Sequence, residues 1–367
     1  MSAKLDASSA GLHGDDGGAH SCRILRGPIE LPMRGAISVV LRGDTVDAIL
    51  DDDGRARVAA FPAGPIPPAG LAAQREPAKE EVRRALSVPC ASTADWDFCS
   101  DRGGAVHRVS AGGGDERVVA NSRSGTRIAV GTLAGSHTAL AYLASRQTSE
   151  GWVSEAWLSL DDDAPVRLSE DGSGATSVAF GMAGSSLVAL TVDARTALTA
   201  MHARPVSYEH GLHLGEDVVV FVGGPGDRRT AAALARPPNG PLLGLLPISK
   251  DVGDFGLALV KLEDPPRVDE PVDWAMYPNG LDPAPVASAS GRTKTWIARV
   301  RPQSADPGSP RELEIGELVE SSSLAPRTIV QTAGVPSDVA MTVDAVGGLW
   351  VAWLDTAGSW LERMVCR

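Results

Sequence analysis

The chain has 367 residues, of which 43% are hydrophobic and 22% charged, so it has enough apolar material for a folded core and is neither a disordered tail nor a fibrous repeat. The formal net charge of −12 argues against nucleic acid as a partner, because the field of the protein repels phosphates. Apolar runs such as residues 349–354 are much shorter than the roughly 20 residues of a membrane helix, so we expect no membrane span.

The beginning of the chain differs from the rest. Residues 1–21 are polar, rich in Gly, Asp and Ser, and lack the apolar segment of a signal peptide or anchor. We expect a disordered lead-in over residues 1–21 and a single domain over residues 22–367. Residues 22–31 have the pattern of a β-strand that belongs to no repeat unit.

One pattern recurs along the remaining chain: a short strand, a small turn, a nearly continuous apolar strand and a polar loop. Four clear copies carry Ile or Val before Ala, at Ile128, Val178, Val286 and Val339, with spacings of 50, 108 and 53 residues. The spacing of 108 residues is two steps of 54, so a further copy is expected near residue 232. With two earlier copies, seven units begin near residues 34, 84, 126, 174, 227, 284 and 337.

A repeat of this length is typical of one fold. A period of about 50 residues with four short strands is the sequence signature of a β-propeller blade. We therefore predict an all-β fold, a seven-bladed β-propeller of four-stranded antiparallel sheets. The last unit has room for only three strands, so the strand at residues 22–31 is expected to complete it and close the ring.

The region after the first unit is less clear. Residues 62–82 are Pro-rich and show no evident strand, which leaves six blades as the alternative. Residues 78–86 have the one helical pattern in the chain: Pro77 fits the first helical position, and Glu80 and Arg84 are spaced for an i,i+4 pair. We predict a short helix there.

The four cysteines form an even set, Cys22, Cys90, Cys99 and Cys366. Ring closure would bring Cys22 beside Cys366, where a disulfide would lock it, and Cys90 and Cys99, on the first two strands of the second unit, would bridge a hairpin. Two disulfides favour an oxidising compartment, because cytosolic proteins rarely keep such bonds. We expect a periplasmic, cell-surface or secreted protein whose signal peptide is absent from this numbering. The alternative is four reduced cysteines in the core.

The closing strand and the repeat length are similar to those of the seven-bladed propeller superfamilies. Residues 118–129, 214–224 and 357–366 resemble an uncharacterised family of exported propeller-like proteins from GC-rich bacteria. That resemblance implies the fold and export but no activity. The chain lacks the Gly-His and Trp-Asp signature of the eukaryotic repeats, and residues 355–360 resemble the Asp-box turn of sialidases in one degenerate copy.

Motifs for catalysis are few. The sequence holds no HExxH, GxSxG, CxxC, Walker or dinucleotide-binding glycine motif. His210 and His213 have the spacing of a metal-ligand pair, but no third ligand is near in sequence, so an exposed loop explains them better. We therefore predict no cofactor.

Two further groups of residues have a structural and a functional interpretation. The acidic runs at residues 51–54 and 161–165 lack the alternating ligands of a calcium loop, so solvated turns explain them better, and calcium is the alternative. Trp350, Trp353 and Trp360 offer faces for sugar stacking, but core packing is the simpler explanation, because two of them lie in an apolar strand.

Loop length points to one face of the ring. The turns between first and second strands are short, whereas the loops between second and third strands and the connections between blades, such as residues 145–151, are long and polar. Function concentrates on such loops, so we predict a binding site on this upper face and its central mouth. The candidate residues are Arg146, Asp193, Arg195, Asp227, Arg228, Tyr277, Asn279, Asp282, Arg301 and Asp355.

Two classes of function fit these observations. The first is an exported, monomeric, non-catalytic binding or scaffold propeller with a protein, glycan or envelope partner, which the lack of a catalytic motif favours. The second is a propeller enzyme, a hydrolase or lyase acting on a lactone or sugar at the central mouth.

Overall fold

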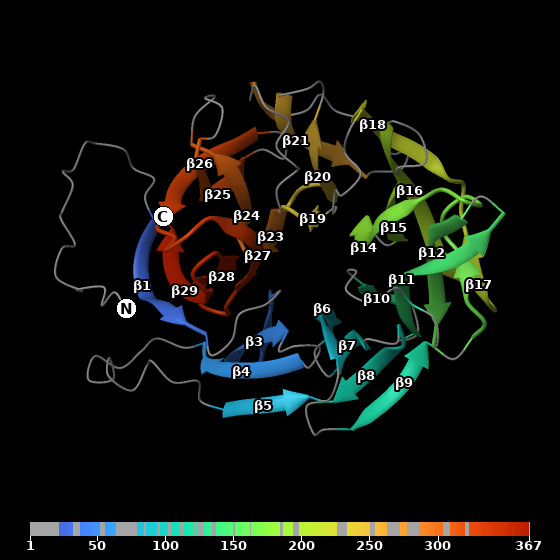
Figure 1. Ribbon diagram of the computed structural model, residues 1–367, viewed down its shortest axis with the longest axis horizontal. Coiled ribbons are helices and arrows are strands. Elements are labelled where there is room, and N and C mark those ends of the chain that lie inside the picture. The colour runs from blue at the N-terminus through green and yellow to red at the C-terminus, as the bar shows by residue number, and fades with distance from the viewer. Residues whose placement is uncertain are drawn as a thin grey trace.

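The computed structural model describes residues 22–31, 37–51, 56–63, 79–83, 86–93, 96–101, 104–110, 114–119, 122, 128–133, 137–149, 151–161, 163–183, 186–193, 198–225, 233–249, 254–262, 272–276, 286–303, 309–319 and 323–366. Within these ranges every regular element is a β-strand, and the strands form seven antiparallel sheets. Figure 1 shows the sheets arranged as blades around a common centre. The protein is thus a seven-bladed β-propeller, as the repeat spacing predicts.

The first three blades follow one another along the chain, each ordered from the centre outward. Blade 1 contains β2 (Ile37–Arg42), β3 (Thr45–Asp51), β4 (Ala56–Pro62) and β5 (Lys79–Arg83). Blade 2 contains β6 (Leu86–Ser92), β7 (Trp96–Asp101), β8 (Val106–Ser110) and β9 (Asp115–Val119). Blade 3 contains β10 (Ala129–Leu133), β11 (His137–Thr148), β12 (Gly151–Leu160) and β13 (Val166–Arg167).

The next three blades repeat this order. Blade 4 contains β14 (Ala175–Ala183), β15 (Ser186–Asp193) and β16 (Leu198–Tyr208), and both β17 (Leu212–Leu214) and β18 (Val218–Pro225) pair with the outer edge of β16. Blade 5 contains β19 (Ala233–Ala235), β20 (Leu243–Ser249), β21 (Asp254–Lys261) and β22 (Val272–Met276). Blade 6 contains β23 (Val286–Ser290), β24 (Thr295–Pro302), β25 (Arg311–Val319) and β26 (Ser323–Val330).

Blade 7 joins strands that lie far apart in the sequence. It contains β27 (Pro336–Val343), β28 (Leu349–Asp355) and β29 (Ser359–Cys366), and its outermost strand is β1 (Cys22–Glu30). β1 runs antiparallel to β29, from Cys22 opposite Cys366 to Glu30 opposite Trp360. In Figure 1 the blue β1 lies along the red β29 at the outside of the ring. The predicted closure of the ring is confirmed.

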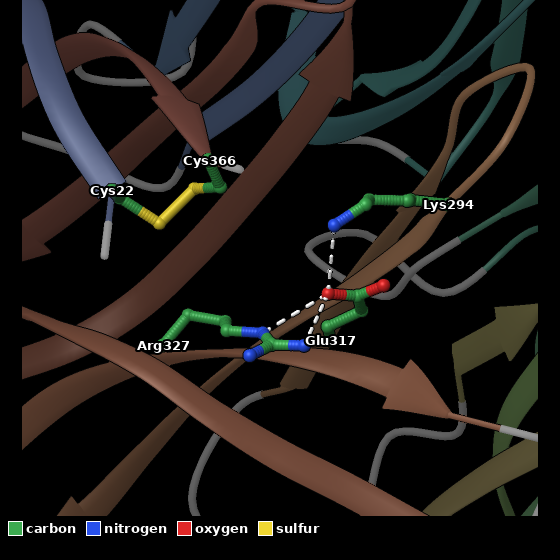
Figure 2. Close-up of a disulfide and its surroundings, with 5 residues drawn as sticks. All are labelled: Cys22, Lys294, Glu317, Arg327 and Cys366. Carbon is green, nitrogen blue, oxygen red and sulfur yellow. Dashed lines mark hydrogen bonds and ion pairs between the residues drawn. A yellow bond between two sulfur atoms is a disulfide. The ribbon is translucent and has the colours of Figure 1, made fainter. Parts of the chain in front are cut away.

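A disulfide between Cys22 and Cys366 fixes this closure, as Figure 2 shows. Cys99 on β7 is also disulfide-bonded and fully buried. Cys90 falls on β6, as predicted, but its side chain lies outside the described residues, so its pairing with Cys99 stays a prediction.

The predicted helix over residues 78–86 is wrong. β5 covers Lys79–Arg83 and pairs with β4 from Ala56 opposite Arg83 to Ala60 opposite Lys79. A helical pattern of nine residues is a weak preference, and pairing with the open edge of a sheet overrides it. This strand is the fourth of blade 1, which explains why the ring has seven blades and not six.

The core consists of apolar layers between neighbouring blades. Leu190 and Val192 of blade 4, for example, form one buried cluster with Leu242 and Val260 of blade 5. The second strand of a blade is covered on both faces, so five successive residues of β28, Leu349 to Trp353, are buried. Such double burial accounts for the nearly continuous apolar runs in the sequence. The described residues form no helix long and apolar enough to cross a membrane.

Candidate functional site

We call the end of the ring where second strands finish and third strands begin the upper rim, and the opposite end the lower rim. Of the ten predicted site residues, the structure describes four, Arg146, Asp193, Arg301 and Asp355. They lie at or near the ends of β11, β15, β24 and β28, so four blades each contribute one of them to the upper rim. The other six lie outside the described residues: Arg195, Asp227, Arg228, Tyr277, Asn279 and Asp282.

In blade 3, Arg146 is held by a carboxylate beneath it. Its Nη2 donates to Oε1 of Glu155 at 2.8 Å and its Nε to Oε2 at 3.2 Å, and the Glu155 side chain is completely buried. The backbone N–H of Gly172 donates to the same carboxylate at 3.1 Å. The hydrogen bonds from Arg146 lower the pKa of Glu155 although burial acts to raise it. Glu155 is thus an ionised, buried support for the upper end of the β11–β12 hairpin.

Asp171 completes this network at the surface. It pairs with Arg146 and accepts a hydrogen bond from Arg167 Nη1 at 3.1 Å. Two arginines and two carboxylates therefore neutralise one another at the base of the hairpin, and we call Arg146, Glu155, Arg167 and Asp171 the hairpin-base network.

Blade 6 uses its arginines in a similar way. Glu314, whose side chain is 1% exposed, pairs with Arg299 at 2.9 Å and also with Arg301. Arg301 Nη2 further contacts Oε1 of Glu312 at 2.8 Å. The predicted site residue Arg301 is therefore bound to two carboxylates of its own blade.

In blade 4 the charges are reversed, with the carboxylate on the second strand and the cation on the third. His202 Nε2 lies 3.1 Å from Oδ2 of Asp193, and its Nδ1 lies 3.4 Å from Oδ1 of Asp217. Hydrogen bonds with Asp193 and, to a smaller extent, with Asp217 raise the pKa of His202 to about 10, although burial acts to lower it. His202 is therefore an imidazolium at neutral pH. The neighbouring Arg204 donates to the carbonyl oxygen of Leu168 at 3.0 Å and so links blade 4 to blade 3.

Asp355 in blade 7 serves the backbone. Its Oδ1 accepts from the N–H groups of Ala357 at 2.7 Å and Gly358 at 2.9 Å, and its Oδ2 accepts from those of Ala333 and Gly334, each at 3.1 Å. Although burial acts to raise the pKa of Asp355, these backbone hydrogen bonds hold it below its ordinary value. Its carboxylate organises the turn between β28 and β29.

The turn at the lower rim of the same blade depends on a second buried aspartate. Oδ2 of Asp344 accepts from Nε1 of Trp350 at 3.0 Å and from Nε of Arg363 at 2.8 Å, while Oδ1 accepts from the N–H of Gly348 at 2.7 Å. Trp350 and Trp353 are 0% and 1% exposed. The core-packing interpretation of these two tryptophans is confirmed.

The remaining sequence candidates lie at the lower rim or in turns. His213 Nε2 is 3.0 Å from the carbonyl oxygen of Glu209, and His210 is exposed in the same turn. In the run at residues 161–165, Asp161 binds Nδ1 of His137 at 2.6 Å and the N–H of Thr138 at 2.9 Å. The described part of the chain contains no group of three or more His, Cys, Asp or Glu that could hold a metal ion.

The lower rim also contains partly buried ion pairs, which Figure 2 illustrates for blade 6. Oε2 of Glu317 accepts from Lys294 Nζ at 3.0 Å and from Arg327 Nη2 at 2.6 Å. In blade 6, charged side chains at both ends of the sheet are thus paired within the blade.

The sequence did not single out Trp152, which is the most exposed of the large hydrophobic residues in the described part of the chain. We expected a loop over residues 145–151, but β11 continues to Thr148 and β12 begins at Gly151, with Gln147 directly opposite Trp152. These strands of 12 and 10 residues extend the second and third strands into a hairpin on the upper rim. Trp152 lies near its end and is 73% exposed. The signal in the sequence that could have identified Trp152 is its position as an aromatic residue directly after the polar segment 145–151.

Comparison with known proteins agrees with the fold. No family model and no curated protein match the chain. A chain of the Saccharomyces cerevisiae complex of a Dbp5 variant with Nup159, a Gle1 variant, IP6 and ADP superposes with a TM-score of 0.51 at 11% identity, covering 96% of each chain.

Two other structures are less similar. The N-terminal domain of Nup159 gives a TM-score of 0.48 at 11% identity over 96% of this chain and 97% of that one. Trypanosoma rangeli sialidase in complex with sialic acid gives 0.44 at 10% identity over 95% of this chain and 59% of the sialidase. At such low identity these likenesses concern the fold alone.

Proposed function

We propose that the protein is an exported, non-catalytic binding or scaffold propeller that engages a protein, glycan or envelope partner through its upper rim. The observation that carries the proposal is the β11–β12 hairpin: it presents Trp152 at 73% exposure, and a buried carboxylate, Glu155, supports its base. A rigid element with an exposed aromatic side chain suits recognition, because little conformational freedom is lost on binding.

The charges of the upper rim support binding over catalysis. Catalytic acids and bases need a site where a proton or a ligand can reach them. Arg146, Asp193 and Arg301 instead pair with neighbours inside their own blades, and Asp355 is occupied by backbone N–H groups. These side chains stabilise the rim on which a partner would dock.

Export and a protein partner rest on separate observations. The Cys22–Cys366 disulfide supports an oxidising compartment, and we propose on that ground that the chain is exported. A propeller of this fold occurs in the yeast complex of Dbp5 with Nup159 and Gle1, which fits a protein partner for a ring of this kind. Membership of the exported propeller-like family from GC-rich bacteria, and a monomeric state, are part of the same proposal.

The test compares the two rims. The purified protein is immobilised, and binding of solubilised cell-envelope fractions is measured by biolayer interferometry for the wild type, for Gln147→Arg on the upper hairpin and for Val346→Arg on the lower rim. Gln147 is exposed and Val346 is 68% exposed, so each substitution adds one exposed arginine. We expect the upper-rim change to reduce the signal and the lower-rim change to leave it unaltered. Equal effects, or a stoichiometric bound metal found by elemental analysis of the purified protein, would contradict the proposal.

A further inference from the structure

Among the tryptophan side chains that the structure describes, only Trp152 is exposed to this degree, and its surroundings indicate a ligand class. The indole lies near the end of a two-stranded hairpin, and the facing residue across the strands is the amide side chain Gln147. Thr148 Oγ1 donates to the carbonyl oxygen of Gly151 at 2.9 Å and so holds the end of the hairpin. An apolar ring face beside polar groups on a fixed element has the composition of a small-ligand site.

The charges below the hairpin favour an uncharged ligand. In the hairpin-base network, Arg146 and Arg167 are both paired with Asp171, and Arg146 also with Glu155. The two arginines and two carboxylates of this network carry no net charge that would attract an anionic ligand, and the net charge of −12 opposes the approach of anions. A neutral ligand needs no such attraction and is not repelled by the net charge of the protein.

The distribution of exposed apolar side chains favours a sugar ring over a protein surface. A protein hot spot lies within a ring of further contacts that exclude water. The other large hydrophobic residues that are exposed in the described part of the chain lie on other blades: Ile24, Val219, Val222, Val335 and Val346. Trp152 is thus a single aromatic surface among polar neighbours. A pyranose ring needs just this, because its C–H face stacks on an indole while its hydroxyl groups bond to polar side chains.

We infer that Trp152 is the stacking platform of a binding site for neutral pyranose saccharides on the upper rim, with Gln147 as a hydrogen-bonding neighbour. The inference rests on the proposed function, and it specifies the glycan alternative within it. It requires no metal and no charged side chain from outside the hairpin.

The experiment uses the full-length protein with cellohexaose, laminarihexaose, maltohexaose and mannohexaose as neutral probes and sialyllactose as an anionic one. Affinity is measured by isothermal titration calorimetry, together with the blue shift of tryptophan fluorescence. The variants are Trp152→Ala, Trp152→Phe and the control Val346→Ala, which removes exposed apolar surface at the lower rim. All positions are exposed, and a thermal melt checks that each variant is folded.

We expect at least one neutral hexasaccharide to bind the wild type and sialyllactose to bind more weakly or not at all. Trp152→Ala should lower that affinity by about tenfold, the size of one aromatic contact, while Trp152→Phe keeps most of it and Val346→Ala all of it. The inference is overturned if no neutral probe binds or if Trp152→Ala binds as the wild type does. Envelope fractions that still bind in an upper-rim-dependent way would then leave the proposed function standing, whereas rim-independent binding would remove both.

Discussion

Blades 3 and 7 use tryptophan in opposite ways. Blade 7 buries Trp350 and Trp353 almost completely, and its turns are held by the buried carboxylates of Asp344 and Asp355. Blade 3 buries the carboxylate of Glu155 but leaves Trp152 in solvent at the end of the longest hairpin. Both blades place an anion in the interior. In blade 7 the buried anion holds a tight turn between strands, whereas in blade 3 it supports the β11–β12 hairpin, which projects into solvent. Burial of charge therefore does not by itself identify a functional site in this ring.

The largest effect is expected when the closure of blade 7 is released. Replacing Cys22 and Cys366 by serine removes a link across 344 residues of sequence, and the chain-entropy model puts its contribution on the order of 5 kcal/mol. We expect a loss of that size in the free energy of unfolding, measured in urea under non-reducing conditions. The same titration of the wild type with and without reductant is the control, and an unchanged midpoint in both would contradict the assigned role of the disulfide.

The contrast between the tryptophans gives the next effect. Trp353→Ala opens a cavity between blades 6 and 7 and should lower the free energy of unfolding by about 3 to 5 kcal/mol. Trp152→Ala should change it by less than about 0.5 kcal/mol, because the side chain is mostly in solvent. Chemical denaturation of both variants measures the difference. Similar losses would mean that Trp152 packs against the protein.

Removing the support of the hairpin should have an intermediate effect. Glu155→Ala leaves Arg146 without its buried partner and the N–H of Gly172 without an acceptor, so we expect a loss of about 1 to 3 kcal/mol. Hydrogen exchange measured by mass spectrometry should speed up over residues 145–153. Glu116→Ala is the matched control, because that carboxylate pairs with Arg108 but is 54% exposed. Unchanged exchange at the hairpin would argue that β-pairing alone holds it.

The remaining effects concern pH, and they distinguish a buried carboxyl group in blade 7 from a paired histidine in blade 4. Burial raises the pKa of Glu362, in blade 7, to about 7 from 4.5, and hydrogen bonds with Asp193 and Asp217 raise that of His202, in blade 4, to about 10 from 6.5. Between the ordinary and the raised pKa of each group, the folded state binds more protons than the unfolded state. The free energy of unfolding therefore falls as the pH rises through this range. For Glu362 the fall lies between pH 4.5 and about 7, and for His202 between 6.5 and about 10.

Two variants distinguish these contributions. Glu362→Gln should flatten the acidic part of a plot of melting temperature against pH, and His202→Gln the alkaline part. A variant that flattens the wrong part, or neither, would refute the assignment of that titration.

Much of the fold follows from the sequence because it depends on repetition. The spacing of Ile128, Val178, Val286 and Val339 predicts the blades, and the missing fourth strand of the last blade predicts that β1 completes it. The fourth strand of blade 1 could not be predicted, because the helical preference of residues 78–86 is local, whereas the edge of β4 that overrides it is not.

The candidate site was predicted less well, for a physical reason. Arg146 can be placed near the end of a strand from sequence alone. Its partners cannot, because Glu155 is brought to it by the register of β11 and β12, and Asp171 by the turn after β13. Whether a charged residue faces a ligand or an internal partner depends on such pairings. The sequence analysis missed Trp152 because the projecting hairpin is formed by the continuation of β11 and β12, which the length of the expected loop does not reveal.

The pairing of β1 with β29 also orders events during synthesis. β1 is made long before the strand that covers its edge, because that strand ends at Cys366, 344 residues after Cys22. Until then the backbone N–H and C=O groups of β1 are without their native partner, and an unpaired strand edge is a template for pairing with other chains. Blades 1 to 6 can stack on one another before β29 is available to pair with β1. A chain released before β29 is made therefore exposes the unpaired edge of β1, and pairing of that edge with another chain competes with closure of the ring.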